Sequence, residues 1–210
     1  MITIHYLNMS RSERIVWLAE ELGLRYELIN HQRDPQTFRA PASLWAVSPL
    51  GKAPVIQDNG KTICESGAVV EYLIERHGHG KLKPKPDSDE YIAYLHWMHA
   101  AESTLMVPIT MDLLGKILQV DVPAYKMFRD GEYKTTLEFL DITLAKSPYV
   151  AGENFTGADV MVAYDLHLAN GTSFPALKST APLESYPNIV AYMKRVEARP
   201  AYQKMRQLCA

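Results

Sequence analysis

The sequence predicts an α/β domain followed by an all-α domain, and three observations support this fold class. The N-terminal third alternates strand patterns with helix patterns. Residues 78–86 are rich in glycine, proline and lysine, which is typical of a linker between domains. Beyond this segment the strand patterns stop, and only helical periodicity follows. We therefore expect one domain at residues 1–80 and a second at residues 88–210.

The first domain begins with a predicted β-α-β unit. Apolar residues at every second position indicate a strand over residues 2–7. A serine three residues before a glutamate, at residues 10–13, has the spacing of a capping box, and helical periodicity follows over residues 15–22. Gly23 stands where helices commonly end. A second strand over residues 26–29 would pair parallel with the first, because a helix connects them.

Two more strands and a helix complete the predicted domain. Asn-Gly at residues 59–60, between two short strand patterns, predicts a type I′ hairpin of residues 55–58 and 61–64. Ser66 can cap the helix that follows, and a short helical turn is expected over residues 43–47. The order is therefore β-α-β, a connection and β-β-α, which is the order of a thioredoxin-like domain with an antiparallel hairpin at one edge of its mixed sheet.

The second domain is predicted to be all-α. Pro108 predicts a kink or break in the first of its helices, and Pro200 is expected to end the last. Thr156 and Asp159 have capping-box spacing, which we assign to stability rather than chemistry. The expected helices cover residues 89–118, residues 126–144, a segment that starts near residue 156, and residues 188–199.

Composition and charge exclude several functional classes. Hydrophobic residues make up 47% of the chain and charged residues 22%, and the net charge of −2 includes no block of like charges. We therefore expect neither nucleic acid nor a membrane surface as a partner. The N-terminus lacks a signal-peptide pattern, and Cys64 and Cys209 form no paired motif, so a cytoplasmic location is expected. His96 and His99 have metal-ligand spacing, but no thiolate or carboxylate motif accompanies them, and we expect no metal.

Four motifs resemble the cytosolic glutathione transferases. Their order, their spacing and the all-α second half extend the resemblance over nearly the whole chain, with a serine-type N-terminal motif of the bacterial-type members. The resemblance implies the glutathione transferase fold, a homodimer, and glutathione as co-substrate. The motifs are Ser10 before the first helix, Leu50-Gly51-Lys52-Ala53-Pro54-Val55, Glu65-Ser66-Gly67-Ala68 and Thr156-Gly157-Ala158-Asp159.

The resemblance also implies how glutathione would be held. Pro54 would follow a cis peptide bond, which turns the backbone of Ala53 toward the cysteinyl backbone of glutathione. Glu65 would meet the γ-glutamyl ammonium, and Ser66 its carboxylate, at a helix start whose N–H groups favour an anion. Lys52 would meet the glycyl carboxylate.

The residue that activates the glutathione thiol is left open among several donors. The thiolate is the nucleophile, and a free thiol with a pKa of about 8.5 is mostly protonated at neutral pH, so a donor aimed at sulfur favours the reactive form. Ser10 is the leading candidate, because the serine-type members place their activating hydroxyl at this point of the chain. Tyr6 is the rival, although its alternation with Ile2 and Ile4 points it toward the core. Asn8 and Ser12 are further candidates, and the segment fits no single branch of the family.

The implied activity is conjugation of glutathione to small hydrophobic electrophiles, with peroxide reduction as a side activity. Two alternatives remain: a glutathione-dependent disulfide reductase on the same fold, and a noncatalytic glutathione-binding scaffold protein. The electrophile would contact the first long helix, where apolar and polarisable side chains give an adaptable surface. The candidate lining residues are Trp97, Met98, Glu102, Met106, Met111 and Leu114.

Overall fold

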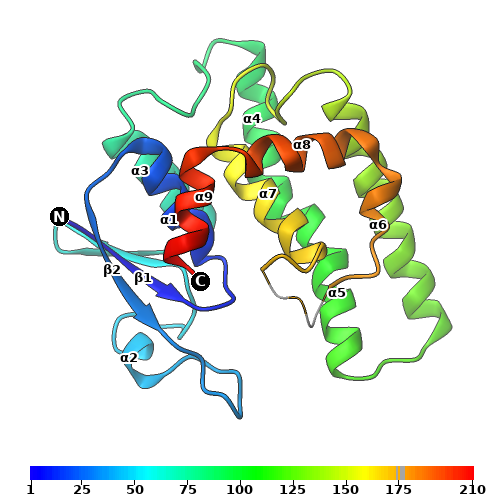
Figure 1. Ribbon diagram of the computed structural model, residues 1–210, viewed down its shortest axis with the longest axis horizontal. Helices are drawn as coiled ribbons and strands as arrows, with labels where there is room; N and C mark the ends of the chain where they lie inside the picture. Colours follow the sequence, from blue (N-terminus) through cyan, green and yellow to red (C-terminus); the bar gives the residue numbers. More distant parts are fainter. Residues whose placement is uncertain (174, 176–177) are drawn as a thin grey trace. The chain divides into compact units, whose positions relative to one another are not determined.

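The computed structural model describes residues 1–173, 175 and 178–210, which form two compact units (Figure 1). Unit 1 comprises Met1–Lys81 together with Ala198–Ala210, and unit 2 comprises Leu82–Glu197. Unit 1 is the expected thioredoxin-like domain with one addition. The C-terminal segment, which the sequence pattern placed in the helical domain, clusters with unit 1.

The sheet of unit 1 has four strands in the order β2-β1-β3-β4. The parallel pair predicted for the β-α-β unit is confirmed between β1 (Ile2–Leu7) and β2 (Tyr26–His31). β1 also pairs antiparallel with β3 (Val55–Asp58).

The predicted hairpin between β3 and β4 (Lys61–Cys64) is also confirmed. Asn59 and Gly60 have φ values of 49° and 73°, and two successive positive φ values are what a type I′ turn requires. The Asn-Gly dipeptide favours this turn locally, because both residues tolerate positive φ.

The two faces of the sheet are covered unequally. α1 (Ser12–Leu22) packs against β1, α3 (Ser66–His77) and α9 (Pro200–Leu208). The opposite face carries the single-turn α2 (Ala42–Trp45), whose Leu44 is fully buried against Leu7 and Val55.

α9 was not expected, because Pro200 was predicted only to end a helix. Proline is tolerated at the first helical position, where its missing N–H has no intrahelical acceptor, so Pro200 starts a new helix. Side chains fix this helix to α1: Arg199 Nε donates to Glu21 at 2.6 Å, and the rings of Trp17 and Tyr202 meet edge-on at 5.1 Å. These contacts join residues nearly the whole chain apart.

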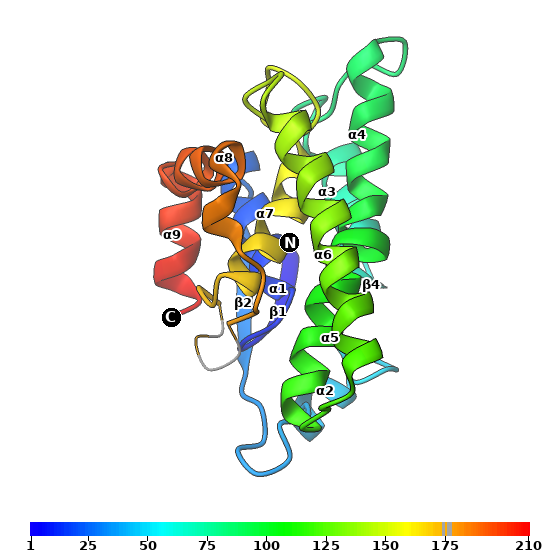
Figure 2. The ribbon, with the colours of Figure 1, turned by 90° about the vertical axis from the view of Figure 1, so that its right-hand side faces the viewer.

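Unit 2 is helical in the residues that the structure describes (Figure 2). The long helix predicted over residues 89–118 is divided into three pieces. The five-residue π-helical turn before α5 precedes Pro108. Proline provides no N–H for the carbonyl four residues earlier and collides with it, so the wider turn accommodates it. The pieces are α4 (Asp89–Ala100), the π turn (Ala101–Leu105) and α5 (Met106–Ile117).

The remaining helices surround a core helix, α7, that is buried on nearly every side. The capping box predicted at its start is confirmed: the Asp159 carboxylate accepts from Thr156 N–H at 2.8 Å and from Val150 N–H at 3.0 Å. Burial raises the pKa of Asp159 to about 6, although these bonds oppose the shift. The helices are α6 (Pro123–Leu144), α7 (Gly157–Ala169), a 3₁₀ turn (Leu183–Ser185) and α8 (Pro187–Glu197).

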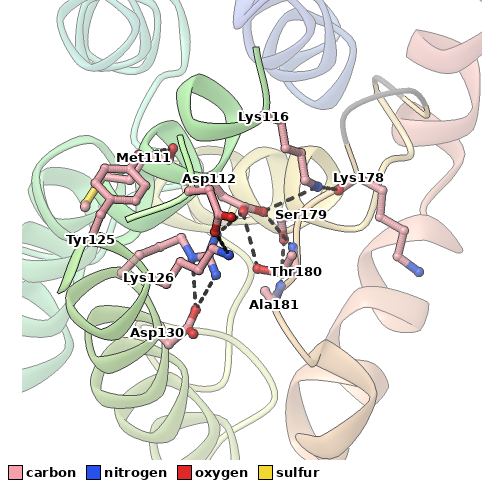
Figure 3. A network of polar contacts seen from close by, with 12 residues as sticks. Met111, Asp112, Lys116, Tyr125, Lys126, Asp130, Lys178, Ser179, Thr180 and Ala181 are labelled. Carbon is pink, nitrogen blue, oxygen red and sulfur yellow. Dashed lines mark hydrogen bonds and ion pairs between the residues drawn. The ribbon is translucent and has the colours of Figure 1, made fainter. Parts of the chain in front are cut away.

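A second buried carboxylate, Asp112, joins α5 and α6 to the segment before the 3₁₀ turn (Figure 3). Its Oδ1 accepts from Arg129 Nη1 at 2.8 Å, and its Oδ2 accepts from the backbone N–H of Thr180 at 2.6 Å. Because each oxygen has a donor, the charge is compensated where it is buried. The cluster stabilises the fold of unit 2.

Candidate functional site

Strand pairing in unit 1 brings three segments of the sequence together at one end of the strands. His5 of β1 lies opposite Val55 of β3, so the end of β1 lies next to Pro54. Val55 in turn lies opposite Cys64, so the start of α3 follows at the same end. The turn after β1, the loop before β3 and the first residues of α3 therefore converge.

The loop before β3 is held in shape by Ser48, which the sequence did not single out. Its buried hydroxyl donates to the carbonyl of Lys52 at 2.8 Å and accepts from the N–H of the same residue at 3.1 Å. The Lys52 side chain stays exposed, and the Ala53-Pro54 peptide bond is cis, as predicted. A serine in a turn carries no sequence signal for such a bond, because its partner is set by the folded loop.

Gly51 allows this loop to approach α2. Its φ is +57°, and a Cβ atom at this position would lie 2.2 Å from the ring of Trp45. Any side chain would therefore meet both backbone strain and a collision. Glycine is required here by the close approach.

The start of α3 differs from the prediction in one residue. Glu65, not Ser66, is the N-cap, with φ of +75°, and its carbonyl accepts the first helical bond from Val69 at 2.9 Å. Ser66 is buried at the first helical position, and its side chain does not cap the helix. A Cβ atom at Gly67 would meet nothing within 4 Å, so the space beside this helix start is open. The first N–H groups have no intrahelical acceptor and favour an anion there.

Ser10 does not form the predicted capping box, because α1 begins two residues later with Arg11 as its N-cap. Its hydroxyl instead donates to the carbonyl of Leu7 at 2.7 Å and lies 2.7 Å from the Ser12 hydroxyl. Ser12 Oγ accepts from the N–H of Leu7 at 3.3 Å. With Ser12 donating to Ser10, the two hydroxyls and the N–H and carbonyl of Leu7 form a closed ring of hydrogen bonds before the start of α1.

Tyr6 and Asn8, like Ser10, take part in hydrogen bonds, but Tyr6 does so as a donor and Asn8 through its acceptor oxygens. The buried Tyr6 phenol donates to the carbonyl of Cys209 at 3.0 Å, and so points to the face that α9 covers. Asn8 Oδ1 accepts from the N–H of Arg33 at 2.8 Å, while Arg33 Nε donates to the Asn8 carbonyl at 3.1 Å. Arg33 thus holds the turn that presents Asn8 and Ser10.

Several residues proposed to line the electrophile pocket lie in the core of unit 2. Trp97, Met98 and Met106 are each 3% exposed. Leu114 is 46% exposed. Methionine and tryptophan at helical spacing therefore contributed to packing here. In the part of the chain that the structure describes, no three side chains of the usual metal-binding types lie together, and no helix is long and apolar enough to cross a bilayer.

Comparison with known proteins identifies the family. Residues 5–82 match the model described as "Glutathione S-transferase, N-terminal domain", and residues 104–200 match "Glutathione S-transferase, C-terminal domain". The chain belongs to the glutathione S-transferase family. "Glutathione S-transferase 3" of Schizosaccharomyces pombe is 34% identical to this transferase, over 96% of its chain and 85% of the relative. "Glutathione S-transferase 1" of Saccharomyces cerevisiae is 26% identical over 99% and 94%.

Solved structures agree with this assignment. A glutathione S-transferase from Actinobacillus pleuropneumoniae superposes with a TM-score of 0.86 at 31% identity, covering 100% of the transferase and 93% of that chain. A family member from Pseudomonas fluorescens, solved with two glutathione molecules bound, gives 0.80 at 20% identity over 97% and 91%, and so shows likeness of fold.

Proposed function

We propose that this transferase binds glutathione at the end of the unit 1 strands and stabilises its thiolate for attack on small hydrophobic electrophiles. The observation that carries the proposal is the convergence of three segments: the cis-proline loop, the open start of α3 and the turn after β1. They offer a backbone edge, an anion-binding helix start and a hydroxyl donor side by side. The electrophile class is the one that the family resemblance implies.

The loop and the helix start would hold the two ends of the tripeptide. The γ-glutamyl carboxylate would lie on the Ser66 hydroxyl and the unpartnered N–H groups of α3, and Glu65 would meet the ammonium. The backbone of Ala53 would pair with the cysteinyl backbone, and Lys52 would meet the glycyl carboxylate. The exposure of Lys52 and the open space at Gly67 support this arrangement.

Ser10 would act as the donor to sulfur. Its hydroxyl now donates to the Leu7 carbonyl, and a bound thiolate would offer a charged acceptor in place of that carbonyl. Charge-assisted bonds are about twice as strong as neutral ones, so the exchange favours the thiolate. Ser12 would continue to donate to Ser10 Oγ, which keeps that oxygen paired. The Tyr6 phenol donates to the Cys209 carbonyl, which makes it less suited to this role. Asn8 is held through its acceptor oxygen, so its amide N–H groups stay the alternative donor.

Titration calorimetry with glutathione, followed by turnover assays, tests the proposal. We expect saturable heat and conjugation of a chloronitroaromatic substrate. The absence of saturable heat at millimolar glutathione would refute the site. Binding with turnover of a glutathione mixed disulfide, but not of the aromatic, would replace conjugation by disulfide reduction. Binding without any turnover would leave a scaffold.

We also propose that two copies associate through the outer face of α4 and α6. The rings of Trp97 and Phe139 stack at 5.6 Å, so these helices lie side by side. Their outward side chains include Ile92 at 72% exposed, Phe139 at 50% and Ile142 at 56%. A face this apolar is usually covered. Light scattering should give twice the mass of one chain, and Ile142→Glu should lower it; a single-chain mass for the unaltered protein would refute the dimer.

A further inference from the structure

A line of polar side chains crosses the α2 face of the sheet and has no part in the site described above. His5 Nε2 lies 3.3 Å from Gln57 Oε1, His5 Nδ1 lies 3.0 Å from His31 Nε2, and His31 Nδ1 lies 2.9 Å from the Ser43 hydroxyl. The register explains the line. His31 lies opposite Leu7, and Gln57 lies opposite Thr3, so each is two residues from the position opposite His5 and shares its face.

The line is continuous because a neutral imidazole has one donor and one acceptor. Both rings are buried, with His5 3% and His31 4% exposed, and they stack with centroids 5.3 Å apart. Burial and the neighbouring His5 lower the pKa of His31, so the neutral ring predominates at neutral pH. Ser43 can then donate to His31, His31 to His5, and His5 to Gln57. Every polar atom of the two rings has a partner.

This line matters because the apolar contact of α2 and its flanking residues Ala40 and Val47 with the sheet is small. The helix is a single turn of four residues, and only Leu44 is buried, against Leu7 and Val55. On so small an apolar contact, one hydrogen bond to the sheet contributes a large share of the attachment. The remaining residues of α2 are exposed.

One end of the line, at Ser43, lies next to the loop that the proposed site uses. The N–H of Ser48 donates to the Leu44 carbonyl at 2.8 Å, and Ser48 holds the backbone of Lys52. Ser43 is therefore connected to this loop through one turn of helix and one side chain. The other end, Gln57, lies within β3 and pairs with Thr3 of β1.

We propose that His5 and His31 are positioning residues that tether α2 to the sheet through Ser43 and thereby fix the 48–52 loop in the form that accepts glutathione. The functional half of this proposal rests on the proposed glutathione site. The structural half, that the tether holds residues 42–52 against the sheet, is independent of glutathione binding.

Ser43→Ala is the decisive variant, because Ser43 is exposed and its loss leaves the core intact. Hydrogen exchange of residues 42–52 in the ligand-free protein should quicken by about two- to tenfold, as expected for the loss of one net hydrogen bond. The KM for glutathione should rise by a similar factor while kcat stays within about twofold. Ser43→Thr retains a hydroxyl and should restore both values.

Two further variants separate the tether from general effects. Thr143→Ala removes an exposed hydroxyl that bonds only to its own helix, at the Phe139 carbonyl, and should change neither measurement. In a His31→Phe background, Ser43→Ala should have no additional effect, because the bond is already absent. Unchanged exchange of residues 42–52 in Ser43→Ala would overturn the tether. If the unaltered protein failed to bind glutathione, the proposed function would fail, and exchange would still decide the tether.

Discussion

Replacing Ser66 by alanine separates a binding role from a folding role at the start of α3. Because Glu65 is the N-cap and the Ser66 hydroxyl caps nothing, the substitution removes no helix-stabilising bond. The free energy of unfolding should therefore change by less than about 0.5 kcal/mol, whereas a lost serine cap typically costs ~1 kcal/mol.

The expected loss is in glutathione binding. A hydrogen bond to a charged group contributes about 1.5–3 kcal/mol, and each 1.4 kcal/mol is about tenfold in affinity. The KM for glutathione should thus rise by about 10- to 150-fold, with a smaller change in kcat. Part of this loss is recovered if water or the neighbouring N–H groups compensate, so the lower end of the range is the better expectation.

Steady-state kinetics with glutathione varied, together with urea unfolding, measures both quantities. Ser88→Ala is a matched control, because Ser88 is the N-cap residue of α4 in unit 2 and its side chain does not cap that helix. It should leave the KM unchanged. An unchanged KM in Ser66→Ala would remove this hydroxyl from the site, and a large loss of stability would show that the serine acts in folding instead.

Three further substitutions test other parts of the structure. Gly51→Ala should lower the free energy of unfolding by about 1–2 kcal/mol and weaken glutathione binding, because the left-handed backbone is strained and the Trp45 ring must move. Denaturant unfolding and calorimetry measure the two effects, and an unchanged free energy of unfolding would contradict the close approach. Ser10→Ala should raise the pKa of the bound glutathione thiol by about one unit, as loss of about 1.4 kcal/mol of thiolate stabilisation requires. The pH dependence of kcat/KM for the electrophile, at saturating glutathione, measures this pKa, and an unchanged profile would assign the role to another donor of the turn. Asp159→Asn should remove a pH-dependent contribution to stability. The folded-state pKa of about 6 lies above the ordinary value of 3.8, so the folded protein binds the extra proton between these values, and the unaltered protein should gain stability relative to the variant as the pH falls from about 6 to 4. Unfolding at a series of pH values measures this, and parallel curves for the two proteins would refute it.

The features that the sequence determined by itself are those with short-range causes. The hairpin at Asn59-Gly60, the end of α1 at Gly23 and the capping box at residues 156–159 each depend on residues within four positions of one another. Backbone preferences and local hydrogen bonds favour such features, and they agree with the packing of the whole fold. The cis bond at Pro54 was predicted from the family resemblance, since an isolated proline is far more often trans.

The sequence predicted which segments would form the proposed site, because their order matched a known family. It did not predict their hydrogen bonds. It assigned a capping role to Ser66 that Glu65 performs, and one to Ser10, which bonds to Leu7 instead. In both cases a shift of one or two residues in the helix start changes what the serine side chain can reach.

What only the tertiary structure decided are the contacts between residues far apart in the chain. Segment 198–210 belongs to unit 1 because Arg199 reaches Glu21, and His5 meets His31 because two strands lie side by side in register. A helical pattern does not reveal which neighbour covers its apolar face, and a histidine in a strand does not reveal its partner. These depend on chain segments that come together only when the fold is complete, so no local pattern in the sequence records them.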